Sequence, residues 1–147
     1  MSDIKRFEDL RVYKVSLVLL ERIYIVAYKI PHLKLRTQLI KSAEAIAPLI
    51  AEGFTRKRNP VDAARFYEMA MVESDEETVH LAEAIILSKH FKQIPVEECE
   101  SLIKEYTSLS KQLNRLSTIW RGFSSKNTLL PEKPKTKTQI LKNRDLI

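Results

Sequence analysis

Residues 95–123 read PVEECESLIKEYTSLSKQLNRLSTIWRGF, and this stretch decides the fold class. Its apolar side chains recur every three or four residues, in the order Cys99, Leu102, Tyr106, Leu109, Leu113, Leu116, Trp120 and Phe123. This spacing places them on one face of a helix, as in the seam of a coiled coil. We therefore expect a helix over about 95–121, with Cys99 in its packed face rather than in a reactive site.

Prolines mark the limits of three further helices. Pro31, Pro60 and Pro95 each disfavour helix in the residue before them, whereas proline itself is well tolerated in a first helical turn. Between these prolines the apolar residues again recur at intervals of three and four. The helices predicted in this way span about residues 7–30, 32–53 and 60–91.

The first two of these helices have distinctive features. The first has two apolar seams, which predict that it is central or buried on two sides. The second contains Pro48, which should bend it because a proline removes a helical hydrogen bond. Gly53 is expected to end the second helix, since glycine closes a helix without a steric penalty at its Cβ position.

Composition narrows the fold class further. The chain has 147 residues with 44% hydrophobic and 30% charged side chains, which is typical of one globular domain. Two glycines are too few for the tight turns of an all-β fold. We therefore predict an all-α protein, an antiparallel up-down four-helix bundle over residues 1–121 with a disordered, basic C-terminal tail over 122–147.

The sequence gives no sign of secretion or of membrane insertion. A single cysteine cannot form an internal disulfide, and the start MSDIKRFEDL lacks the apolar run of a signal peptide. The longest aliphatic stretch, residues 15–27, is interrupted by Glu21 and Arg22 and is too short to cross a bilayer. We therefore expect a cytoplasmic protein with no membrane partner.

The net charge of +6 is divided into blocks. Residues 1–60 carry +6, residues 61–105 carry −7 and residues 106–147 carry +7. This segregation favours either self-assembly of oppositely charged faces or contact between the basic blocks and a polyanion. An ordinary solvated helix surface is the simpler alternative, but it explains segregated blocks less well than interleaved charges.

An acidic ridge in the third predicted helix is the best candidate for a metal site. Glu73, Glu76, Glu77 and His80 share one helix face, and Glu77 and His80 have the Glu-x-x-His spacing of di-iron bundles. That site needs a second copy of the motif, which this sequence lacks. We therefore predict no metal and no cofactor. The preferred interpretation is a structural ion pair of Glu76 with a basic residue of the second helix, Arg36 or Lys41.

No enzymatic motif is present. The sequence has no glycine-rich phosphate loop, no Gly-x-Ser-x-Gly and no histidine placed to activate Cys99. We therefore expect a protein without catalytic activity.

A basic loop is the strongest functional candidate. Arg56, Lys57 and Arg58 follow the second predicted helix without an acidic neighbour, and three consecutive cations suit contacts with phosphates. A solvated turn is the alternative. The lysines of the tail favour the interpretation as a polyanion site, and the predicted contacts from the tail are Lys133, Lys135 and Lys137.

Four stretches resemble a known family. They are FEDLRVYK at 7–14, QLIKSAEAI at 38–46, IAEGFTRKR at 50–58 and FYEMA at 66–70. They resemble, in the same order, the bacterial proteins first named for reading frames in intervening sequences of 23S rRNA. The most specific part is IAEG-x-x-R, which includes Glu52, Gly53 and Arg56.

The resemblance implies a non-enzymatic antiparallel four-helix bundle that often forms a homopentamer. A structurally similar relative is the accessory protein of diversity-generating retroelements, a basic pentamer that binds nucleic acid and a reverse transcriptase. Two hypotheses follow. The chain is an oligomer that binds nucleic acid, most simply structured RNA, through its basic loop and tail, or it is an adaptor that docks a partner enzyme such as a reverse transcriptase.

Overall fold

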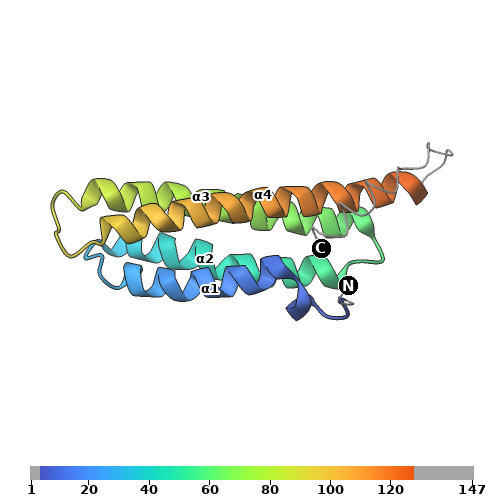
Figure 1. The fold of residues 1–147 in the computed structure, drawn as a ribbon, viewed down its shortest axis with the longest axis horizontal. Helices are drawn as coiled ribbons and strands as arrows, with labels where there is room; N and C mark the ends of the chain where they lie inside the picture. Colours follow the sequence, from blue (N-terminus) through green and yellow to red (C-terminus); the bar gives the residue numbers. More distant parts are fainter. Residues whose placement is uncertain (1–3, 128–147) are drawn as a thin grey trace.

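The computed structural model describes residues 4–127, which form an elongated bundle of antiparallel helices (Figure 1). A short 3₁₀ helix, η1 (Phe7–Asp9), precedes α1 (Arg11–Ala27), α2 (Leu33–Thr55), α3 (Pro60–Leu87) and α4 (Val96–Asn127). Each helix packs on the next along the chain, α1 also contacts α4, and the contact between α3 and α4 is the most extensive. The predicted all-α, up-down four-helix bundle is confirmed.

The connections lie at two opposite ends of the bundle (Figure 1). The α1–α2 and α3–α4 connections share one end, and the α2–α3 connection lies at the other end together with the N-terminal segment. The candidate basic loop is therefore separated from the other two connections by the length of the bundle.

Several helix limits differ from those expected. The predicted first helix is divided at Leu10, whose backbone is extended, and α1 ends at Ala27. Helix α3 ends at Leu87 rather than near residue 91. Helix α4 continues to Asn127, so the predicted end at 121 is wrong because the helix extends past the apolar seam. Residues 128–147, which hold most of the predicted tail, lie outside the described residues.

Side-chain caps explain where two helices begin. The Asn59 side chain accepts a hydrogen bond from the Asp62 amide at 3.5 Å, and Pro60 occupies the first turn of α3. At the other end of the bundle, His32 Nδ1 accepts a hydrogen bond from the Leu35 amide at 3.1 Å and caps α2. The proline at position 60 therefore has the predicted role.

The core contains the apolar seam that defines α4. The seam from Cys99 to Leu116 is buried, and burial raises the pKa of the Cys99 thiol to about 11, as suits a packing residue. Of the two seams on α1, the one through Leu19 and Ile23 is buried, whereas Leu17 of the other is exposed. Burial on both sides of α1 is thus only partly achieved in the described chain.

Gly53 lies inside α2 and does not end it. The helix runs on through Pro48 and Gly53 to Thr55, and the prediction that Gly53 terminates it is wrong. Gly53 is buried against α3, where a Cβ atom would lie 2.7 Å from Cε1 of Tyr67. Glycine is therefore needed for the close approach of two helices rather than for an unusual backbone angle.

Candidate nucleic-acid interface

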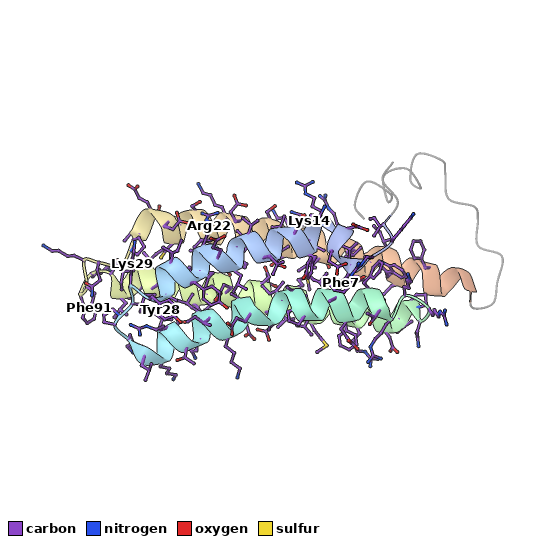
Figure 2. The ribbon with its side chains drawn as sticks, turned by 90° about the horizontal axis from the view of Figure 1, so that it is seen from below. Phe7, Lys14, Arg22, Tyr28, Lys29 and Phe91 are labelled. Carbon is purple, nitrogen blue, oxygen red and sulfur yellow. The ribbon has the colours of Figure 1, made fainter. Side chains whose placement is uncertain are left out.

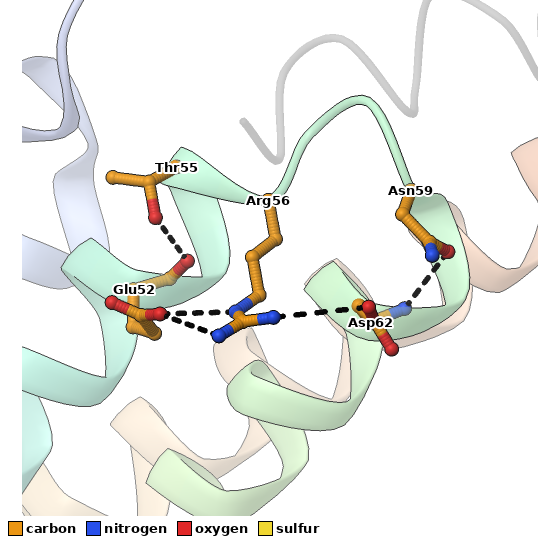
Figure 3. A network of polar contacts seen from close by, with 5 residues as sticks. All are labelled: Glu52, Thr55, Arg56, Asn59 and Asp62. Atoms are coloured by element: carbon orange, nitrogen blue, oxygen red, sulfur yellow. Dashed lines mark hydrogen bonds and ion pairs between the residues drawn. The ribbon is translucent and has the colours of Figure 1, made fainter.

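The basic loop is held by a network that joins the end of α2 to the start of α3 (Figure 3). Arg56 Nη2 lies 2.9 Å from Glu52 Oε1, one turn earlier in α2. Arg56 Nη1 lies 3.8 Å from Asp62 Oδ2, in the first turn of α3. Its guanidinium carbon also lies 4.7 Å from the centre of the Phe66 ring. Arg56 therefore bridges the two helices.

The same junction contains the contact of Gly53 with Tyr67. Tyr67 is fully buried, and its ring also lies 6.4 Å from that of Trp120 on α4. Gly53 and Arg56 belong to the stretch IAEGFTRKR, whereas Phe66 and Tyr67 belong to FYEMA. The two stretches that carry much of the family resemblance thus pack against each other.

Lys57 and Arg58 differ from Arg56 in their surroundings. Both are exposed, and neither pairs with a carboxylate in the part of the chain that the structure describes. The Lys57 ammonium lies 4.7 Å from the centre of the Phe54 ring, which leaves its positive charge unneutralised. The structure thus brings the three predicted residues onto one loop and gives Arg56 two carboxylate partners within the chain.

Sequence reasoning did not single out Arg65. It lies in the second turn of α3, is exposed and has no carboxylate partner among residues 4–127. An isolated arginine on a helix gives no sequence signal that separates it from an ordinary solvated residue. The predicted tail contacts, Lys133, Lys135 and Lys137, lie outside the described residues.

The acidic ridge of α3 is divided between surface and core. Glu76 is exposed, and within residues 4–127 no ion pair joins it to Arg36 or Lys41. Arg36 instead donates hydrogen bonds to the Ile30 carbonyl oxygen from Nε at 3.0 Å and from Nη2 at 2.7 Å. Burial and the negative charge of Glu76 raise the pKa of the Glu73 carboxyl. The positive charge of Lys41 opposes this rise.

Glu77 is the unexpected member of the ridge. Its side chain is 0% exposed, and neither carboxylate oxygen has a hydrogen-bond partner among the described residues. Burial, followed by the charge of Glu73, raises its pKa to about 9, so Glu77 is a neutral acid at pH 7. The helical spacing placed Glu77 on the core face, but the sequence alone did not separate a buried acid from a paired one.

The described residues offer no assembled metal site. No group of three or more histidine, cysteine, aspartate or glutamate side chains in residues 4–127 is arranged to hold an ion. His80 Nδ1 lies 3.1 Å from Glu83 Oε1 on the same helix, so the partner of this histidine is a single carboxylate one turn further along α3. In the same part of the chain, no helix combines the length and the apolarity needed to cross a bilayer.

Comparison with known proteins identifies the family. No curated protein and no solved structure matches the chain. The family model described as 23S rRNA-intervening sequence protein matches residues 8–115, a region that includes most of η1, the first three helices and much of α4. The junction of Glu52, Gly53 and Arg56 with FYEMA lies within this match. The chain therefore belongs to the 23S rRNA-intervening sequence protein family.

Proposed function

We propose that this protein is a non-enzymatic homo-oligomer that binds structured RNA through its basic loop. Lys57 and Arg58 would contact phosphates, Arg56 would fix the loop, and tail residues Lys133, Lys135 and Lys137 would add contacts. The observation that carries the proposal is the pair of exposed, unneutralised cations on a connection that the Arg56 bridge attaches to both helices. A held loop presents its charges with less loss of conformational entropy than a free one.

Two exposed apolar stripes support the oligomeric part of the proposal. On α3, Val72, Val79 and Ile86 are exposed at seven-residue intervals, on the most acidic segment of the chain. On α1, Val18 and Ile25 are exposed at the same interval, with exposed Glu21 between them. The two apolar stripes suit a contact between α3 of one subunit and α1 of the next.

Such a contact joins two different faces and would close into a ring. The family resemblance implies five subunits. A ring would repeat Lys57 and Arg58 around one rim, and this multivalency would strengthen a weak local charge. Light scattering should give a multiple of the 17.1 kDa subunit mass, and Val79→Asp should reduce it without unfolding the chain. A strictly monomeric wild-type protein at micromolar concentration would contradict the ring.

Charge reversal in the loop tests RNA binding. The double variant Lys57→Glu/Arg58→Glu should bind a short RNA hairpin more weakly than the wild type. Each lost phosphate contact should also reduce the slope of log affinity against log salt by roughly 0.7 to 0.9. Lys104→Glu/Lys111→Glu is the matched control, because it changes the net charge equally at exposed lysines on α4.

The outcome separates RNA binding from the adaptor hypothesis. If both double variants weaken binding equally, the effect is one of net charge and the loop is not the site. If the wild type does not bind the hairpin at any salt concentration, the exposed stripes of α1 and α3 favour an adaptor for a partner protein. An apolar docking surface would change little with salt.

A further inference from the structure

The end of the bundle opposite the basic loop presents exposed aromatic rings. Tyr28 is 66% exposed after the end of α1, and Phe91 is 37% exposed in the connection between α3 and α4. Figure 2 shows both residues at the same end of the molecule. Among the exposed large hydrophobic residues of the described chain, Tyr28 and Phe91 are the aromatic ones. Two exposed rings at one end of the bundle offer flat apolar faces on which a planar group can stack.

The Tyr28 ring is held in a defined position. The guanidinium carbon of Arg36 lies 5.9 Å from the ring centre, and Arg36 is anchored by its two hydrogen bonds to the Ile30 carbonyl. The Tyr28 amide in turn donates to the Tyr24 carbonyl at 3.2 Å. The ring therefore has a cation against it, whereas two thirds of its surface stays open to solvent.

Exposed lysines also lie at this end of the bundle. Four lysines of this end are exposed and lack a carboxylate partner within residues 4–127; they are Lys29, Lys34, Lys89 and Lys92. Lys29, Lys89 and Lys92 lie in the two connections and Lys34 in the first turn of α2, and Figure 2 shows Lys29 beside Tyr28. Of the nearby carboxylates, Glu98 pairs with Arg22 and Glu83 contacts His80, whereas Glu97 in the first turn of α4 is exposed and has no ion pair in the described chain. This end of the bundle therefore combines stacking surfaces with unneutralised cations.

A groove lies between the N-terminal turns of α2 and the end of α3. Its volume is about 490 Å³, and it is lined by His32, Lys34, Leu35, Gln38, Glu83, Ile86, Leu87 and His90. Imidazole and amide groups in such a groove offer hydrogen-bond donors and acceptors to the edge of a planar polar group.

We infer that this end of the bundle is a stacking platform for unpaired RNA bases, with Tyr28 and Phe91 as its rings and the four lysines as its phosphate contacts. The inference rests on the proposed RNA binding and adds a second site with a different substrate class. A duplex hides its base faces, whereas a loop or single strand presents them to aromatic rings. The basic loop would hold paired RNA, and the opposite end would hold its unpaired bases.

Binding of a single-stranded oligouridylate and of an RNA duplex with the same number of phosphates tests the platform. Tyr28→Ala should lower affinity for the single strand roughly 5- to 100-fold, because one stacked base is lost. Affinity for the duplex and the salt slope for the single strand should not change. Tyr28→Phe should retain the affinity, and Leu33→Ala, which shortens an exposed aliphatic side chain at the same end of the bundle, should have no effect.

The loop variant distinguishes this inference from the proposed function. If Lys57→Glu/Arg58→Glu leaves duplex binding intact while Tyr28→Ala weakens single-strand binding, the loop proposal fails and the platform stands. If Tyr28→Ala and Phe91→Ala leave single-strand affinity unchanged, the platform is wrong. It is also wrong if these variants lower only the mass of the oligomer, because the rings would then belong to a protein contact.

Discussion

The buried Glu77 predicts an unusual dependence of stability on pH. Its carboxyl group has no solvent exposure and no hydrogen-bond partner in the described chain, and its pKa is raised from 4.5 to about 9. Between these two values the unfolded chain releases the Glu77 proton and the folded chain keeps it. The stability from this group is therefore complete below about pH 4.5 and is lost as the pH rises toward 9.

The size of the effect follows from the two pKa values. Each pH unit between them lowers the free energy of unfolding by about 1.4 kcal/mol. Raising the pH from 5 to 7 should therefore cost the wild type about 2–3 kcal/mol through Glu77 alone. Glu77→Gln removes the titration and keeps a neutral polar group of nearly the same shape. Between pH 5 and pH 7, the free energy of unfolding of this variant should therefore rise by about the same amount relative to that of the wild type.

Urea unfolding from pH 5 to pH 9 measures this difference. The groups that face Glu77 include Glu73 on its own helix and Tyr106 on α4, and Arg22 of α1 acts on Tyr106 in turn. They are present in both proteins, so the difference between the two curves isolates Glu77. Glu105→Gln is the control, because Glu105 is exposed on α4 and acts on neither Glu73 nor Glu77, so it should leave this pH dependence unchanged. Parallel curves for the wild type and Glu77→Gln would refute the reasoning.

Three further predictions concern the junction and the tail. Gly53→Ala should destabilise the fold by about 1–2 kcal/mol in thermal or urea unfolding, because overpacking 2.7 Å from the Tyr67 ring outweighs the gain in helix propensity. Arg56→Ala should cost about 1 kcal/mol of stability, yet weaken RNA hairpin binding less than the reversal of Lys57 and Arg58. Removal of residues 128–147, for which the sequence predicts a flexible tail, should also weaken hairpin binding less than that reversal, since a flexible segment loses conformational entropy when it binds.

The fold was predictable because local signals agreed with one another. Pro60 and the cap at Asn59 indicate the same start for α3, and the three-four spacing of α4 indicates the face that packs in the core. The misplaced limits have specific causes. Gly53 has two possible uses in a helix, as a terminator and as a site of close approach, and only the position of Tyr67 on another helix decides between them.

The sequence predicted where the candidate site lies, but not that its three cations would have different roles. Three adjacent cations were expected to act alike, whereas Arg56 meets Glu52 four residues before it and Asp62 six residues after it. The Glu52 pair could be read from helical spacing. The Asp62 contact depends on how α3 turns back toward α2. Likewise, Tyr28 and Phe91 are distant in the sequence, and only the antiparallel topology places them at one end.

The arrangement at the α2–α3 junction separates the residues that hold the loop from those that face solvent. Glu52, Gly53 and Arg56 make their contacts inside the chain, so replacing one of them disturbs the approach of α2 to α3. Lys57 and Arg58 make no ion pair there, so replacing them changes the charge of the surface and leaves the junction intact. If the chain binds RNA as proposed, its phosphate contacts should accordingly depend on Lys57 and Arg58, whereas Glu52, Gly53 and Arg56 determine how the loop is held.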